Sequence, residues 1–365
     1  MTAVNQRKLL NQDKVLPFYE ERKRVDGAEL PPLAVELHWT SDCNYDCVHC
    51  SYGSRRQAKG RLSTETIQSV VDDLVRLKAK AVYLSGGGEP TMVKGWAGYA
   101  ETLLDGGVEV ALITNGVALR DKDVPVLRRF NYIAVSVYST VSEEYEAITD
   151  SRFFDRQWQV PGMAKAADSK TVIGARCVIN KVNYRRILDV YEQAREAGFD
   201  YILFIPAVDY EGKGIALGEA ELNEVRSSLE DRKESFDPAF TNVRELLERQ
   251  VHHYAQRDYR DDFARPPLAC SSVDYRLNAF VNYCGGVWLC QPHIGNADYC
   301  IGNLNDMSFA EIWNAPRHRE VTASLNRNFS EGKCDKCRSI RFSQAIDRHV
   351  QAPVDLEGIS FDPFV

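Results

Sequence analysis

Short apolar runs alternate with amphipathic segments from residue 33 to about residue 210. The apolar runs are rich in β-branched and aromatic residues, which is typical of buried parallel strands. Between them, hydrophobic residues recur at intervals of three and four, as they do on one face of a helix. The pattern predicts six strands, at Leu33–Trp39, Ala81–Ser85, Val108–Thr114, Tyr132–Val137, Thr171–Ile179 and Tyr201–Ile205.

Two of the amphipathic segments also carry signals for helix ends. Ser63 is suited to cap a helix. The apolar face of that helix would contain Ile67, Val70, Val71, Leu74 and Leu77. The segment Asn183–Ala197 has similar spacing, and Gly198 suits its C-terminal end. Six strand–helix repeats favour a parallel sheet with right-handed crossovers, so the predicted fold is α/β, a partial (β/α)6 barrel with its site at the carboxyl ends of the strands.

Changes in composition and hydrophobic periodicity along the sequence divide the chain into five parts. Residues 1–32 form an N-terminal extension, and residues 33–215 form the barrel. Strongly charged helical patterns predict a solvated helical linker over residues 216–262. Over residues 263–350 helical periodicity fades, glycine and aromatic residues increase, and six of the ten cysteines appear, which indicates a second domain. Residues 351–365 form a tail.

Composition and charge narrow the class of protein. Hydrophobic residues make up 44% and charged residues 27% of the chain, which is ordinary for a soluble globular protein. A net charge of −7 does not attract phosphate backbones, so we expect no nucleic-acid partner. No apolar run approaches the roughly 18 to 20 residues that span a bilayer, and Met1–Arg24 lacks a signal-peptide core. We therefore expect a cytoplasmic protein without a membrane partner, whose ten cysteines favour metal ligation over disulfides.

Three cysteines, Cys43, Cys47 and Cys50, occupy one short loop directly after the first predicted strand. Three thiolates this close can bind three irons of a [4Fe–4S] cube and leave the fourth iron open for chemistry. A zinc knuckle is the alternative, but zinc sites usually pair cysteines as Cys-x2-Cys or Cys-x4-Cys and close with a nearby fourth ligand. His49 could be that ligand, although its position between two cysteines is sterically awkward.

The cysteine loop resembles the signature of the radical S-adenosylmethionine (radical SAM) superfamily. Further motifs of that family follow in the same order along the chain, at His49, Gly87–Glu89, Thr114–Gly116 and Ser136. The resemblance implies that the open iron binds SAM and that one electron from the reduced cluster yields a 5′-deoxyadenosyl radical, which abstracts a hydrogen atom. It also implies SAM-binding residues, which we assign to Tyr45, Gly86, Gly87, Gly88, Glu89, Asn115 and Ser136. For the glycines, a tight turn without a ligand is the alternative.

A second set of cysteines lies in the C-terminal region, as Cys270-x14-Gly285-x4-Cys290 and Cys334-x2-Cys337. Four thiolates can close a cluster completely, which suits electron transfer or structural anchoring, and tetrahedral zinc is the alternative. The arrangement is similar to the SPASM domain, or its shorter one-cluster form, twitch, found in many radical SAM enzymes. The resemblance implies an auxiliary [4Fe–4S] cluster on these four cysteines, while Cys284 and Cys300 could ligate a second, incomplete cluster.

The resemblance further implies an enzyme that removes a carbinol hydrogen from a sugar or aminocyclitol-type small molecule in natural-product or antibiotic biosynthesis. In this dehydrogenase the auxiliary cluster accepts an electron, and a flavodoxin- or ferredoxin-type protein donates one to the first cluster. The alternatives are an epimerase with a cysteine hydrogen donor, a peptide-modifying enzyme, and a non-catalytic iron–sulfur scaffold. The peptide alternative ranks lower because only about 32 residues precede the first strand. The candidate catalytic residues are Cys284, Cys177, Arg176 and His293.

Overall fold

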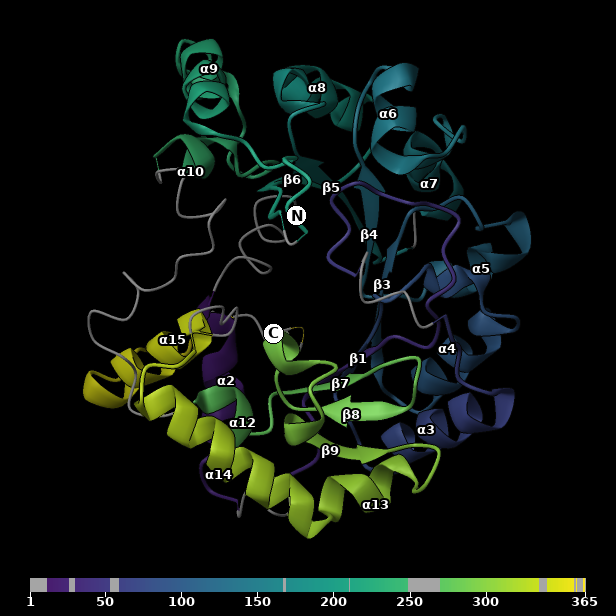
Figure 1. Ribbon diagram of the computed structural model, residues 1–365, viewed down its shortest axis with the longest axis vertical. Helices are drawn as coiled ribbons and strands as arrows, with labels where there is room; N and C mark the ends of the chain where they lie inside the picture. Colours follow the sequence, from purple (N-terminus) through teal and green to yellow (C-terminus); the bar gives the residue numbers. More distant parts are fainter. Residues whose placement is uncertain are drawn as a thin grey trace.

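The computed structural model describes residues 12–25, 30–52, 59–166, 169–209, 211–248, 270–334, 340–357, 359 and 364. Within these residues the strands form one sheet in the order β6-β5-β4-β3-β2-β1-β7-β8-β9. The first six strands pair in parallel, and helices flank them on the outside, which gives the partial barrel of Figure 1. Their bounds are β1 Ala34–Leu37, β2 Ala81–Leu84, β3 Glu109–Thr114, β4 Tyr132–Val137, β5 Val172–Ile179 and β6 Tyr201–Pro206.

These six strands confirm the predicted α/β fold, with each strand end within two residues of its predicted position. The helices between them are α3 Thr64–Arg76, α4 Trp96–Asp105, α5 Val124–Leu127, α6 Ser142–Thr149, α7 Arg156–Ala164 and α8 Ile187–Glu196. The Ser63 hydroxyl caps α3 by accepting a hydrogen bond from the Thr66 amide at 3.1 Å, as predicted. Helix α8 starts later than predicted, because Tyr184–Arg186 forms a 3₁₀ turn ahead of it.

The segment after β6 packs on the barrel and is not the solvated linker that its charge pattern predicts. Helix α9, Glu219–Glu230, buries Leu222, Val225 and Leu229 in the main hydrophobic core. Thr241 then forms a parallel bridge with Ile202 of β6, ahead of α10, Val243–Glu248. The charged positions of α9 occupy its solvent face, while its apolar stripe is buried. Residues 249–262 of the predicted linker lie outside the described part, and the domain boundaries remain predictions.

The C-terminal region continues the barrel sheet. Strand β7, Asn278–Val281, pairs in parallel with β1, and β8, Gly286–Trp288, and β9, Cys300–Asn303, follow in antiparallel order. Among the described residues of this region, four helices cover the sheet: α12 Ser271–Asp274, α13 Phe309–Asn314, α14 Pro316–Ser330 and α15 Ile340–Gln351. Helix α2, Leu16–Arg22, from the N-terminal extension, packs against α15 through Phe18, Ala345 and neighbouring apolar residues. The two ends of the described chain therefore belong to the same part of the fold (Figure 1).

Small residues and one aromatic ring close the amino-terminal end of the barrel. Alanines at the starts of the strands leave room that larger side chains would fill, and Phe364 occupies it at 3% exposure. The Phe364 ring meets Tyr83 and Tyr132 edge-on, with centroid distances of 4.9 and 5.2 Å. The Lys14 ammonium donates a hydrogen bond to the Phe364 carbonyl. These contacts give the barrel a floor.

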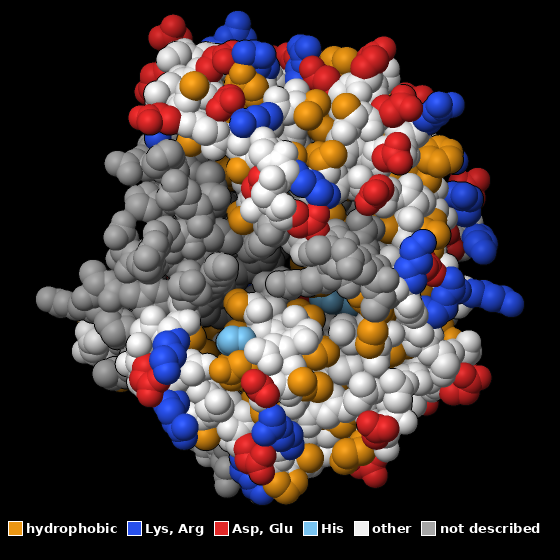
Figure 2. Space-filling model, in the orientation of Figure 1, with side chains coloured by type: hydrophobic (Ala, Val, Ile, Leu, Met, Phe, Trp, Pro, Cys, Tyr) orange, Lys and Arg blue, Asp and Glu red, His pale blue; other side chains and the backbone are white. Residues whose placement is uncertain are grey.

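The surface view shows acidic and basic side chains intermixed over both halves of the molecule on the face drawn (Figure 2). None of the helices in the described ranges is long and apolar enough to cross a bilayer.

Candidate active site

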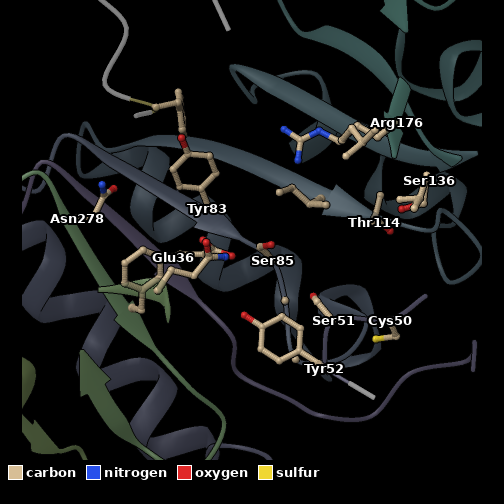
Figure 3. A pocket seen from close by; sticks show the side chains of 18 of the residues that line it. Glu36, Cys50, Ser51, Tyr52, Tyr83, Ser85, Thr114, Ser136, Arg176 and Asn278 are labelled. Carbon is tan, nitrogen blue, oxygen red and sulfur yellow. The ribbon is translucent and has the colours of Figure 1, made fainter. Parts of the chain in front are cut away.

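One cavity of about 570 Å³ opens inside the barrel and is lined by both parts of the fold. Cys43, Cys47 and Cys50 lie on one side of it, while Cys270 and Cys290 contribute from the C-terminal region. Figure 3 shows the strand side chains around this space. The cysteine loop and two of the four cysteines predicted for the second set therefore border the same cavity.

Backbone contacts fix the loop that carries Cys43, Cys47 and Cys50. The amides of Asp46 and Val48 donate to the carbonyls of Thr149 and Ile148, at 2.8 and 2.9 Å, which ties the loop to the end of α6. The Cys50 amide donates to the Cys47 carbonyl at 3.0 Å, so these two cysteines share one turn. The loop is thus held in place by protein contacts as well as by any bound cluster.

Aromatic side chains pack against the cysteine loop. Tyr138 at the end of β4 places its hydroxyl 3.7 Å from the Cys47 sulfur, and its ring lies 5.1 Å from the His49 ring. Tyr45 shares a hydrogen bond with Tyr145 through their hydroxyls. Burial lowers the pKa of His49 to about 4, so the imidazole is neutral at pH 7. Burial and hydrogen bonding around the cluster ligands are among the factors that tune the potential of an iron–sulfur cluster.

The glycine segment after β2 lies directly against the chain that precedes Cys43. A Cβ atom on Gly88 would lie 2.0 Å from the Asp42 carbonyl oxygen, and one on Gly87 would lie 2.8 Å from the Thr40 carbonyl oxygen. Gly86 and Gly87 also have positive φ angles, of 42° and 72°, which glycine adopts without strain. The Glu89 amide donates to the Asp42 carbonyl at 2.8 Å. Glycine is therefore needed here because the two loops pack too closely for a side chain. That the same glycines let the backbone approach SAM stays a prediction.

Glu89 joins the ends of β2 and β3. Its carboxylate accepts hydrogen bonds from the Thr91 hydroxyl at 2.5 Å, the Thr114 hydroxyl at 2.6 Å and the Asn115 amide at 2.8 Å. Burial raises the pKa of Glu89 above its usual range, and the hydrogen bonds act in the opposite direction. Glu89 is 3% exposed and lines the cavity. Its hydrogen bonds hold the ends of β2 and β3 together at the rim of the cavity where SAM would bind.

The structure also places the other predicted SAM-binding residues at the cavity. Asn115 and Ser136 line it, from the end of β3 and from β4, as does Tyr45. The Asn115 side-chain amide donates to the Asn44 side-chain oxygen at 2.7 Å, which links the β3 end to the cysteine loop. The predicted residues thus share one rim, although their SAM-binding roles are not tested by these contacts.

The second cysteine set is only partly described. Cys270 caps the start of α12, and Cys290 follows β8 at the start of a short 3₁₀ turn. Gly285, between these cysteines in the sequence motif, has a φ of 86°, and a Cβ there would lie 2.5 Å from the Asn303 side-chain oxygen. Cys334 is partly exposed, and Cys337 lies outside the described residues. The glycine of the motif is therefore needed for the β7–β8 turn.

The donor sets fit iron–sulfur clusters. Within the described ranges, no three His, Cys, Asp or Glu side chains converge on the position of a single metal ion. Such convergence is not needed for a [4Fe–4S] cluster, because each of its cysteines binds a different iron. Cys43, Cys47 and Cys50 would hold the first cluster, and Cys270 and Cys290 would contribute to the second.

The four candidate catalytic residues lie in different surroundings. Arg176 of β5 lines the cavity, whereas Cys177, the next residue, faces away from it and is 2% exposed. Burial raises the pKa of the Cys177 thiol well above its usual range. Cys284 is exposed in the β7–β8 turn, and the His293 ring stacks on Tyr299 with a centroid distance of 3.9 Å. Catalytic roles for Cys177, Cys284 and His293 stay predictions that their positions do not favour.

The cavity also contains strand residues that the sequence analysis did not single out. Glu36 of β1, Tyr83 of β2, Ser85 directly after β2 and Asn278 of β7 face it (Figure 3). Glu36 lies 2.8 Å from the His38 ring nitrogen Nε2. A polar residue inside an apolar strand, such as Glu36, is the signal that could have indicated these positions, because alternate residues of a strand face the same side.

A partial barrel with a cysteine loop after its first strand and a second cysteine set at the same cavity defines a radical SAM enzyme with an auxiliary cluster domain. The chain matches the radical SAM superfamily over residues 37–213 and the SPASM iron–sulfur cluster-binding domain over residues 270–338. It belongs to the radical SAM superfamily and carries a C-terminal SPASM domain. Its cofactors are accordingly SAM, a SAM-binding [4Fe–4S] cluster and auxiliary iron–sulfur.

Individual relatives were found among both curated proteins and solved structures. The chain is 24% identical over 313 residues to the mycofactocin maturase MftC of Mycolicibacterium smegmatis, covering 84% of this chain and 75% of that protein. It is 23% identical over 167 residues to the sporulation killing factor maturation protein SkfB of Bacillus subtilis, covering 46% of this chain and 40% of that protein. The structure resembles SuiB of Streptococcus suis bound to its precursor peptide SuiA, with a TM-score of 0.59, 14% identity, and coverage of 84% and 70% of the two chains.

Proposed function

We propose that this protein is a radical SAM enzyme that oxidises a peptide at an unactivated C–H bond. The observation that carries the proposal is the single cavity bordered by Cys43, Cys47 and Cys50 and also by Cys270 and Cys290. A substrate held there lies next to both cysteine sets. SAM and the reduced first cluster, when bound, supply a 5′-deoxyadenosyl radical that abstracts hydrogen, and the second cluster supplies an electron acceptor.

The choice of a peptide over a sugar or aminocyclitol rests on the relatives. MftC is named as a maturase, SkfB is named as a maturation protein, and SuiB was solved with a precursor peptide. These names favour the peptide-modifying alternative over the small-molecule dehydrogenase. The length of chain before the first strand does not oppose it, because that length does not limit what the cavity accepts.

Oxidation is favoured over epimerisation by the positions of the candidate hydrogen donors. An epimerase needs a thiol that reaches the substrate radical. Cys177 faces away from the cavity and is buried, while Cys284 is exposed in a turn that does not line it. Cys300 also does not line the cavity, and its sulfur lies 3.1 Å from the Gly302 carbonyl oxygen.

The residues around the cavity have separable tasks in this proposal. Tyr138 packs against His49 and Cys47 and covers part of the cysteine loop, and restricting water in this way protects a reactive intermediate from quenching. Glu89 and Asn115 hold the rim in one arrangement through their hydrogen bonds. A preorganised rim of this kind keeps the reacting atoms aligned.

The test uses anaerobically reconstituted protein with SAM, dithionite and a panel of short synthetic peptides. We expect 5′-deoxyadenosine together with a peptide that has lost two hydrogen atoms, detected by mass spectrometry. Deuterium placed on the peptide carbon should appear in the 5′-deoxyadenosine. If deuterium is transferred only from sugars or aminocyclitols, the small-molecule dehydrogenase is the correct function. Cys50→Ala serves as the inactive control.

A further inference from the structure

Arg176 carries a positive charge into the cavity and lies on the central part of β5. In the sheet register it stands beside Ser136 of β4 and Leu203 of β6. Its side chain enters the cavity, and its guanidinium points away from Cys50 and towards Tyr83 (Figure 3). The charge therefore lies deeper in the barrel than the cysteine loop.

Three tyrosines interact with the guanidinium. These are Tyr132, Tyr201 and Tyr83, and Tyr132 does so through a hydrogen bond. The Arg176 Nε atom is buried and donates no hydrogen bond. None of the ion pairs among the described residues involves Arg176. The guanidinium thus enters the cavity with one donor unsatisfied and no carboxylate paired with it among these residues.

The carboxylates that line the cavity are engaged elsewhere. Glu89 accepts four hydrogen bonds, from Thr91, Thr114 and Asn115. Glu36 lies within hydrogen-bonding distance of the His38 ring. A guanidinium inside a cavity without a carboxylate partner is unfavourable, and its planar array of donors matches a carboxylate held by two hydrogen bonds. An anionic ligand would complete this arrangement.

We propose that Arg176 binds a carboxylate of the substrate. On the peptide proposed above, which this inference adopts for the identity of the ligand, the group is the C-terminal carboxylate or an Asp or Glu side chain. SAM is the other source of a carboxylate in this cavity. Gly88, which matches a SAM-binding motif, packs against Asp42 beside the cysteine loop. The guanidinium points away from Ser136 and Cys50 (Figure 3). Arg176 is in this account a specificity-determining residue.

Binding of two small probes to the reconstituted enzyme tests the proposal without a known substrate. N-acetylglycine carries the carboxylate, and N-acetylglycinamide lacks it. We expect the wild-type protein to bind the acid about tenfold more tightly than the amide, since a charged hydrogen-bonded pair contributes at least that much. The preference should vanish in Arg176→Gln and be partly retained in Arg176→Lys, with dissociation constants measured by nuclear magnetic resonance titration.

Three results would overturn the assignment. The first is equal binding of acid and amide by the wild-type protein, a result that does not depend on whether a variant folds. The second is an acid preference that persists in Arg176→Gln. The third is a loss of SAM affinity of about tenfold or more in Arg176→Gln, measured by equilibrium dialysis, because Arg176 would then bind the SAM carboxylate. If the acid preference holds but no peptide is modified, the peptide function fails and the carboxylate site remains.

Discussion

Replacing Gly88 with alanine perturbs the contact between the glycine segment and the cysteine loop. The added Cβ would lie 2.0 Å from the Asp42 carbonyl oxygen and 2.6 Å from the carbonyl carbons of Asp42 and Ser41. Ordinary contact begins at 3.4 Å, so one of the two backbones must move by more than 1 Å. Backbone atoms meet the Cβ on the facing side, and no flexible side chain can move away to relieve the contact.

The cost of this movement can be estimated from the contacts it breaks. The hydrogen bond from the Glu89 amide to the Asp42 carbonyl, 2.8 Å long, would be lost. That loss and the overpacking together should lower the free energy of unfolding by about 2 to 4 kcal/mol. Because Asp42 is next to Cys43, displacement of the loop should also impair cluster assembly.

The assay compares Gly88→Ala with Gly98→Ala, a control within α4 where a new Cβ has no atom within 4 Å. We expect Gly98→Ala to keep full iron content and 5′-deoxyadenosine formation and to gain up to about 1 kcal/mol in stability. Gly88→Ala should lose the SAM-cleaving cluster and unfold at a lower temperature. If the two variants behaved alike, the close approach of the two loops would not be what requires glycine.

Four further substitutions test other parts of the structure. Burial, with a further contribution from Arg276, lowers the pKa of His318 to about 4, so unfolding takes up a proton as pH falls from about 6.5 to 4. Wild-type stability should therefore fall over that window, by at most about 1.4 kcal/mol per pH unit from this group, and His318→Gln should flatten the decline in urea titrations. Phe364→Ala should cost about 3 to 5 kcal/mol by opening a hole in the barrel floor, and a calorimetric melting temperature equal to wild type would show that the ring fills no core space. Cys177→Ala and Cys284→Ala should each keep full turnover. Loss of product in either variant would support the alternative function, an epimerase in which that cysteine donates the hydrogen atom.

Much of the barrel is predictable because its signals are local. The runs from Tyr132 to Val137 and from Thr171 to Ile179 need only β-branched composition and helical flanks to be recognised as strands. The cysteine spacing from Cys43 to Cys50 likewise reports its chemistry directly. Such features require no knowledge of which distant segments meet.

The remaining features depend on tertiary contacts that no local pattern records. Alternation shows that Arg176 and Cys177 face opposite sides of β5, but not which side is the cavity. The parallel pairing of β7 with β1 and the seating of Phe364 between Tyr83 and Tyr132 join segments more than 200 residues apart. Helix α9 has many charged residues but also a buried apolar stripe of Leu222, Val225 and Leu229. Its composition alone therefore predicted a solvated linker.

The central claim is that two iron–sulfur clusters border one cavity and only the first binds SAM. Electron paramagnetic resonance of the reduced protein, with and without SAM, tests it most directly when wild type is compared with the triple variant Cys43→Ala, Cys47→Ala and Cys50→Ala. We predict about eight irons per wild-type chain and a spectrum that SAM changes, and about four irons in the triple variant with a spectrum that SAM leaves unchanged. A triple variant whose remaining cluster still responds to SAM, or a wild-type protein with only one cluster, would contradict the account.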